Sequence, residues 1–425
     1  MSDPSVLQRL LDTAAAQLHD IADTAPDDET SGRLEQLRDL VLGAGVLSAE
    51  GSPEAGAAAS AVARLIPSIG DPAADDELYR AGTVLLNRPT GVETTEDQGE
   101  PPADELTAAQ VEAYLRDRFP GARDEVVSVN TIHGGFSKRT TLVEGSVDGV
   151  SEEFVLRQVP TGLSARSLTS EYALLCSLAS TNVPAPRPLW IDAQDNALGG
   201  PFFATRRAAG SNIGDVWGSA GATEQTCRDV AEIYARLHQV PTAGIVTPVS
   251  SRVTSDDLAA TIAKQEGTLL QRGITIQPLL AALLEWLRRN LPAVPPRPSL
   301  LHGDAAFSNL LVADGRVTAI VDWEAAHVGN PAEELAYIRP SVTPVMEWDD
   351  FIDHYVLHGG LAPDPSAMRF FTVWSHVWRH IGCLWLAQNF EQTGRYASAI
   401  AGFVHGPRFL RSAVDAAFGT HAAVS

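Results

Sequence analysis

The chain has 425 residues, 44% of them apolar, and a formal net charge of −22. This composition is that of a globular protein with room for several domains. The sequence shows neither an apolar run long enough to span a membrane nor a secretory signal. Its three cysteines are widely spaced, which predicts reduced thiols and a cytoplasmic location. So large a negative charge argues against binding to nucleic acid or to anionic membrane surfaces.

Residues 1–90 are predicted to form an acidic helical domain. Apolar residues such as Leu7, Leu10 and Ala14 follow the spacing of an amphipathic helix. Residues 91–106 are polar, acidic and rich in proline, which is the composition of a linker. Most of the net charge lies before the end of this linker, because the rest of the chain carries only −7. The N-terminal segment is a candidate for homodimerisation or for binding a protein partner.

Beyond the linker the apolar pattern predicts a small β-rich lobe and then a larger helical lobe. Thr107 is the expected N-cap of a helix that ends at Arg118. Short strands are predicted at 126–129, 141–143, 154–156 and 201–205, with a helix over 164–180 and a hairpin pattern at 298–321. We therefore predict a small lobe at 107–208 and a large lobe at 209–425. The cleft between two such lobes is a favoured ligand site.

The sequence H-G-D-x4-N carries the strongest chemical signal of the chain. Asp304 and Asn309 belong to this motif, and Asp322 follows another apolar run thirteen residues later. A turn at Ala313-Asp314-Gly315 would bring the two segments side by side. Phosphoryl transfer needs a carboxylate to take the proton of the attacking hydroxyl and oxygen ligands for Mg²⁺. Asp304 fits the catalytic base, and Asn309 and Asp322 fit the metal ligands.

These segments resemble the catalytic and metal-binding loops of the aminoglycoside phosphotransferase-like (choline kinase-type) family. The run that begins at Asp322 is similar to that family's signature D-W-E-x-A-x-x-G-x-P-x-x-D-L-A, most of all in the branch fused to acyl-CoA dehydrogenases. The resemblance implies an α+β, protein-kinase-like two-lobed fold with an appended N-terminal helical segment. Glu334 stands where the family commonly has Asp, at a position that we expect to brace the site.

The resemblance extends to the nucleotide site. Gly134, Gly135 and Ser137 lie in a segment that is similar to the family's G-G-x-S loop, whose backbone amides would hold phosphates. Arg157 occupies the strand where the family places a phosphate-binding cation, and Glu171 matches that cation's partner on the following helix. The resemblance thus implies an ion pair between Arg157 and Glu171.

The segment around Arg206 and Ala208 resembles the family's hinge, where backbone groups would hold the adenine. Relatives often carry Glu at the position of Arg206. Backbone recognition does not depend on that side chain, so ATP is the expected nucleotide and GTP remains an alternative.

The acceptor is not specified by any motif. The family name suggests an aminoglycoside, while the acyl-CoA dehydrogenase branch suggests a hydroxyacyl compound or another small metabolite, which we favour. The alternative of another class is a nucleotide-binding regulatory or scaffold protein without turnover. All the catalytic positions named above hold competent residues, which favours an enzyme.

Overall fold

The computed structural model describes most of the chain from Leu106 onward. The described residues are 106–119, 125–132, 138–147, 150–159, 166–194, 196–213, 219, 221–304, 306–393 and 405–419. They form two compact units, one of residues 106–258 and 292–368 and the other of residues 259–291 and 369–419. The predicted N-terminal domain and most of the linker lie outside the described residues. Within these ranges, none of the helices combines the length and the apolar character needed to cross a membrane.

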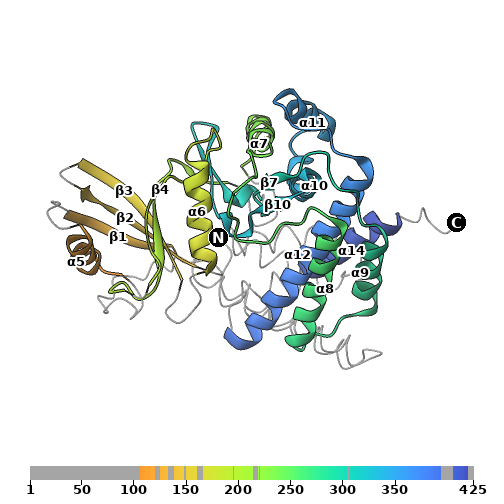
Figure 1. Ribbon diagram of the computed structural model, residues 1–425, viewed down its shortest axis with the longest axis horizontal. Helices are drawn as coiled ribbons and strands as arrows, with labels where there is room; N and C mark the ends of the chain where they lie inside the picture. The colour runs from red at the N-terminus through yellow and green to blue at the C-terminus, as the bar shows by residue number, and fades with distance from the viewer. Residues whose placement is uncertain are drawn as a thin grey trace, which may run out of the picture. The chain divides into compact units, whose positions relative to one another are not determined.

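The first unit begins with a five-stranded antiparallel sheet in the order β1-β2-β3-β5-β4 (Figure 1). Its strands are β1 (Glu125–Ile132), β2 (Arg139–Val147), β3 (Val150–Gln158), β4 (Pro188–Asp192) and β5 (Phe202–Arg206). Four of these strands were predicted from the sequence. The fifth, β4, was missed because it begins at a proline, which is tolerated here since β4 lies at the edge of the sheet.

The helix α5 (Ala108–Arg118) packs on β1 and covers the apolar core of the sheet. Thr107 caps this helix as predicted, through a capping box with Gln110. The core beneath it contains an edge-to-face contact between Tyr114 and Phe202, with ring centroids 5.3 Å apart.

Successive side chains of β3 point alternately to the two faces of the sheet, one of which faces the apolar core. Phe154 and Leu156 point into the core, so Arg157, one position further, points to the other face of the sheet. The helix α6 (Arg166–Leu178) contacts β4 and β5 (Figure 1). Its buried side consists of leucines together with Glu171, which is only 2% exposed. A buried carboxylate needs a partner, and its partner is described below.

The rest of the first unit holds short strands and helices that carry the polar motifs. Its elements are β6 (Ser211–Asn212), α7 (Glu224–Leu237), β7 (Ser299–Leu301), η2 (Phe307–Asn309), β8 (Leu310–Ala313), β9 (Arg316–Ile320), η3 (Trp323–Ala325), β10 (His327–Gly329), α10 (Pro331–Val342) and α11 (Trp348–Leu357). The predicted hairpin is confirmed: Ala313 pairs with Arg316, and Asp314 and Gly315 have φ of 50° and 72°. The strand β10 pairs with β7, and β6, β8 and β9 form a small sheet.

The second unit is helical. It includes α9 (Pro278–Arg289), α14 (Gly406–Phe418) and most of α8 (Ser255–Gln271) and α12 (Pro365–Thr393). Helices α9 and α14 pack against each other, and the stacked rings of Trp374 and Trp378 lie 5.9 Å apart along α12.

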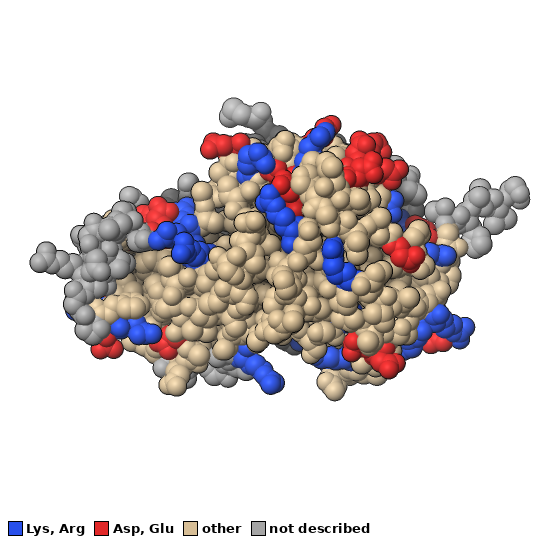
Figure 2. Space-filling view, turned by 45° about the horizontal axis from the view of Figure 1, so that its top comes forward, with Lys and Arg blue, Asp and Glu red and all other residues tan. Residues whose placement is uncertain are grey.

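Basic and acidic side chains are interspersed on the face shown in Figure 2, between large uncharged areas. Some exposed charges of the described residues form pairs one helical turn apart, for example Arg116 with Glu112 and Arg289 with Glu285. Exposed pairs of this kind contribute at most about 1 kcal/mol each.

Candidate active site

Asn309 folds back onto Asp304 in the segment that follows β7. The side-chain amide of Asn309 donates to the carbonyl oxygen of Asp304 at 2.9 Å and to its Oδ2 at 3.1 Å. Tyr337, on α10, donates its hydroxyl to Oδ1 of the same carboxylate at 2.7 Å. Both carboxylate oxygens therefore accept a hydrogen bond, which fixes their orientation. Because the amide nitrogen of Asn309 faces Asp304, its amide oxygen faces away from that carboxylate.

Gly303 lets the loop approach the segment beyond β9. Its φ is +81°, and a Cβ added to it would lie 2.3 Å from the carbonyl oxygen of Ala325. Both the left-handed backbone and the close approach require glycine. Next to it, the ring of His302 packs on Trp323 with centroids 4.6 Å apart. These contacts hold the loop of Asp304 against the segment that carries Asp322.

Asp322 ends the β8–β9 hairpin in a left-handed backbone conformation, with φ 70° and ψ 64°. A non-glycine residue in that region is strained, and such strain is common at ligand sites. The amide of Val321 donates to the carbonyl oxygen of Asn309 at 2.9 Å, which joins the two predicted metal-ligand segments. Arg157 donates to Oδ1 of Asp322 at 2.7 Å. Burial raises the pKa of Asp322, and the nearby Arg157 opposes that effect.

The oxygens of Asp322 and Asn309 form a donor set that suits Mg²⁺. This cation takes carboxylate and amide oxygens and usually keeps only one or two protein ligands, with phosphate and water oxygens as the rest. In the described part of the chain no group of three His, Cys, Asp or Glu side chains gathers as a metal site. Two protein oxygens are the number that Mg²⁺ commonly takes when phosphate and water oxygens complete its coordination.

Glu334 holds the backbone of the loop that carries Asp304. Its Oε1 accepts the amide of His302 at 2.8 Å and that of Gly303 at 3.1 Å. Its Oε2 lies 2.9 Å from Nε2 of His238, whose Nδ1 lies 2.8 Å from the hydroxyl of Tyr355. The side chains of Glu334 and His238 are fully buried. The expectation that Glu334 braces the site rather than reacting agrees with these contacts.

The neighbouring Glu333 forms a second buried network. It contacts Nη1 of Arg252 at 2.8 Å and Nε2 of His327 at 3.1 Å. Burial alone would raise the pKa of Glu333, but the charges of His327 and Arg252 lower it to about 2. Both glutamates lie in the first turn of α10, whose N-terminus favours negative charge. The side chain of Asn330 caps this helix through the amide of Ala332.

The predicted ion pair between Arg157 and Glu171 is wrong. Arg157 donates to Thr140, its partner across β2 and β3, at 2.8 Å, and to Asp322. Glu171 instead accepts from Lys138 at 2.7 Å, and Lys138 also donates to Glu324 at 2.5 Å. The strand register explains this, because it directs the guanidinium of Arg157 to Thr140 and Asp322 while Lys138 meets the buried carboxylate.

Lys138 is the site residue that sequence reasoning missed. The resemblance places the phosphate-binding cation in the strand of Arg157, and that strand contains no lysine. Two signals could have found Lys138: it directly follows the G-G-F-S segment, and it is one of only two lysines in the chain. Because lysine is so rare in this chain, a lysine next to the G-G-F-S segment is a stronger signal of a specific role than another arginine would be.

The other predicted nucleotide contacts are only partly described. Gly134, Gly135 and Ser137 lie outside the described residues. Arg206 ends β5 with an exposed side chain, and its amide donates to the carbonyl oxygen of Arg187 at 2.8 Å. The amide of Arg206 is thus engaged within the fold, and Ala208 follows just beyond the end of β5.

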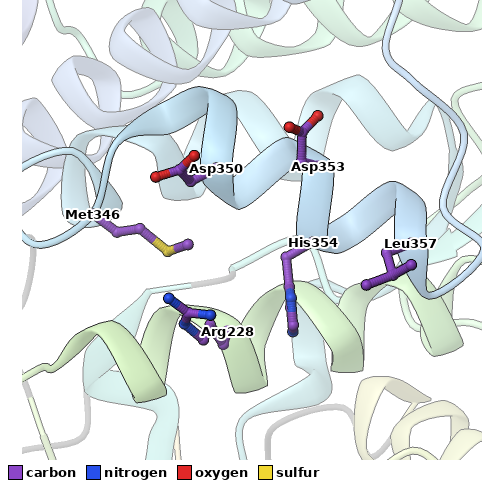
Figure 3. Close-up of a pocket in the computed structure, with 6 residues that line it drawn as sticks. All are labelled: Arg228, Met346, Asp350, Asp353, His354 and Leu357. Carbon is purple, nitrogen blue, oxygen red and sulfur yellow. The ribbon is translucent and has the colours of Figure 1, made fainter.

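A separate cavity of about 450 Å³ lies between α7 and α11 (Figure 3). It is lined by Arg228, Met346, Asp350, Asp353, His354 and Leu357. None of the residues around Asp304 lines it. The cavity is thus distinct from the cluster of Asp304, Asn309 and Asp322.

The chain was compared with known proteins. A model of the phosphotransferase enzyme family matches residues 128–371. Over 276 residues the chain is 25% identical to acyl-CoA dehydrogenase family member 11 of Homo sapiens, which covers 60% of this chain and 34% of that protein. It is 26% identical to hygromycin-B 4-O-kinase of Escherichia coli over 243 residues. That alignment covers 55% of this chain and 67% of the kinase.

The fold has counterparts among solved structures. A Ralstonia eutropha JMP134 protein assigned as an aminoglycoside phosphotransferase matches with a TM-score of 0.57 and 18% identity, over 73% of this chain and 98% of that chain. These findings confirm the resemblance and the kinase-like α+β fold predicted from the sequence. The chain spans only about a third of the length of the acyl-CoA dehydrogenase relatives, 34% for the human protein.

Proposed function

The chain belongs to the phosphotransferase enzyme family, and from this premise we propose that it is a small-molecule phosphotransferase that transfers the γ-phosphoryl group of ATP to a hydroxyl group. The observation that carries this proposal is the convergence of Asp304, Asn309 and Asp322 on one hairpin and one loop. A carboxylate of fixed orientation beside two oxygen ligands is what an in-line phosphoryl transfer requires.

In this mechanism Asp304 orients the acceptor hydroxyl and takes its proton. The new bond forms between the acceptor oxygen and the γ-phosphorus while the bond to the bridging oxygen of ADP breaks. Tyr337 and Asn309 hold the carboxylate of Asp304 through its two oxygens, so little reorganisation is needed when the acceptor binds. Most of the rate enhancement would come from this positioning and from charge stabilisation.

Asn309 and Asp322 would hold Mg²⁺, which supplies positive charge to the phosphate oxygens during transfer. In the described structure Arg157 donates to Oδ1 of Asp322, and it would turn to the phosphates when they bind. The G-G-x-S loop with Gly134, Gly135 and Ser137 would cover the phosphates. The segment of Arg206 and Ala208 would hold the purine, with ATP favoured and GTP as the alternative.

We propose a hydroxyacyl compound or a similar small metabolite as the acceptor, in preference to an aminoglycoside. The relatives that support this preference are acyl-CoA dehydrogenase family members, whereas hygromycin-B 4-O-kinase supports the antibiotic. Thermal-shift measurements with Mg²⁺ and a non-hydrolysable ATP analogue present would separate them. Stabilisation by hydroxyacyl-CoA compounds supports the preference, and stabilisation by aminoglycosides alone contradicts it.

Turnover is tested by the release of ADP from ATP, with and without Mg²⁺, against a pooled set of hydroxylated metabolites and antibiotics. We expect release that depends on both the metal and one acceptor, and a product whose mass has increased by one phosphoryl group. If the protein binds Mg-ATP but turns over no acceptor, a regulatory role without catalysis replaces this proposal.

Residues 1–90 are proposed to be a separate helical domain that joins two copies of the chain or binds a protein partner, in a cytoplasmic enzyme. Its acidic composition and the linker at 91–106 support this proposal. Deleting residues 1–100 and measuring the molar mass in solution and the turnover tests it. An unchanged monomer with unchanged turnover would contradict a role in dimerisation.

A further inference from the structure

Lys138 lies between two carboxylates that come from distant parts of the chain. Its ammonium nitrogen is 2.7 Å from Oε2 of Glu171 on α6 and 2.5 Å from Oε2 of Glu324 in η3. Glu324 follows the candidate metal ligand Asp322 by two residues, and Lys138 directly follows the G-G-F-S segment. The side chain of Lys138 therefore links the nucleotide loop, the helix α6 and the metal-binding segment.

The two carboxylates differ in burial, which gives them different roles. Glu171 is 2% exposed, as is Lys138, whereas Glu324 is 35% exposed. Glu171 sits on the apolar side of α6 and would be left as a buried, uncompensated charge without Lys138. Glu324 reaches solvent, so water can hydrate its carboxylate when it leaves the ammonium. Burial alone would lower the pKa of Lys138, but the two carboxylates raise it above its ordinary value, so the group stays charged.

We propose that Lys138 is a phosphate-binding cation of this site, in parallel with Arg157, and that Glu324 occupies its phosphate-binding position until a nucleotide enters. The inference rests on the proposed function. An ammonium group has three donors, so Glu171 can keep its hydrogen bond while a phosphate oxygen replaces Glu324. Glu171 is then the anchor, and Glu324 is the competitor that leaves.

The pair of Arg157 and Asp322 repeats this arrangement beside it. In each case a cation contacts a carboxylate of the segment 322–324 that is partly exposed, 32% for Asp322 and 35% for Glu324. Entry of a nucleotide would exchange both carboxylates for phosphate oxygens. The alternative is a purely structural Lys138 that fastens α6 to the sheet. The two roles differ in whether the loss of Lys138 weakens ligands with phosphate groups more than ligands without them.

The test is to measure dissociation constants of ATP and of adenosine by calorimetry on the full chain without Mg²⁺. For Lys138→Gln we expect ATP to bind at least tenfold more weakly while the affinity for adenosine stays within twofold. Lys264→Gln is the matched control, because Lys264 is exposed on α8 and is the only other lysine. It should leave both constants unchanged. A structural role would instead weaken both ligands equally.

Glu324→Gln gives an independent readout with the opposite sign. Removal of the competitor should tighten ATP binding several-fold without Mg²⁺, with adenosine unchanged, and the gain should vanish in the Lys138→Gln background. If Lys138→Gln does not fold, Glu324→Gln decides alone, and unchanged or weaker ATP binding overturns the inference. If wild type binds ATP but neither variant changes it, only this inference fails. If wild type binds neither ATP nor adenosine, the proposed function fails with it.

Discussion

The two sides of the site differ in the kind of contact that holds their charged groups. Around Asp304 both carboxylate oxygens accept hydrogen bonds from side chains, and the loop is held by Glu334. The side chains of Glu334 and His238 are fully buried. Arg157 and Lys138 each contact one carboxylate that is about a third exposed, Asp322 and Glu324 respectively, while Lys138 also keeps the buried Glu171. In the proposed mechanism the first arrangement persists through the reaction cycle, whereas the second exchanges its carboxylates for phosphate oxygens. We infer that a cation whose carboxylate partner is partly exposed can accept a ligand, whereas a fully buried partner indicates a bracing contact.

Removal of the brace should give the largest loss of stability. Glu334→Ala leaves two loop amides and the ring of His238 without their buried partner. We expect a loss of about 3–5 kcal/mol in the free energy of unfolding. Urea unfolding followed by tryptophan fluorescence measures it. Glu334→Gln is the matched control, since it keeps the shape and one acceptor and should lose clearly less. Equal losses would show that the hydrogen bonds to the loop do not matter.

Acid should weaken the second buried network. Because the pKa of Glu333 falls from 4.5 to about 2 in the folded protein, its contribution is fully present above pH 4.5 and is lost as the pH falls towards 2. The contribution is on the order of 3 kcal/mol. Glu333→Gln should be less stable than wild type at neutral pH, and its stability should fall less between pH 4.5 and 3. Parallel pH profiles of unfolding would contradict the ionised state of Glu333.

Arg157→Gln should separate binding from stability. The side chain of Arg157 is partly exposed, so we expect a change of at most about 1 kcal/mol in the free energy of unfolding. We expect ATP to bind at least tenfold more weakly, because the guanidinium would donate to phosphate oxygens. Unfolding and nucleotide titration of the same preparation give both values. A large loss of stability with normal ATP binding would place Arg157 with the bracing residues.

The smallest effect is expected on the surface. Arg289 pairs with Glu285 one helical turn away on α9, and 76% of its side chain is exposed. Arg289→Ala should change the free energy of unfolding by no more than about 0.5 kcal/mol. A larger change, measured in the same urea series, would mean that exposure is a poor guide to the importance of a pair in this protein.

The sequence predicted the parts of the site that are local in the chain. Asp304 and Asn309 are five residues apart, and the turn at Asp314 and Gly315 fixes where Asp322 falls relative to them. Only a short loop and a hairpin are needed to bring these three residues together, and both leave recognisable patterns in the sequence. The strand register that places Arg157 on the functional face follows from simple alternation.

The contacts that sequence reasoning missed join distant segments. Lys138 is 33 positions from Glu171 and 186 from Glu324, and Glu334 is 96 from His238. No periodicity shows which of several cations a buried glutamate will meet, because that depends on side-chain reach across packed elements. The resemblance predicted Arg157 as the partner of Glu171, but in this chain Lys138 forms that ion pair.

The most direct test of the central claim compares wild type with Asp304→Asn. The two carboxylate contacts to Tyr337 and Asn309 suggest that the amide can occupy the same place. We predict that the dissociation constant of Mg-ATP stays within about threefold while acceptor-dependent turnover falls at least about a hundredfold, since only the proton acceptor is lost. Turnover close to that of wild type, with normal Mg-ATP binding, would contradict the assignment of Asp304 as the base.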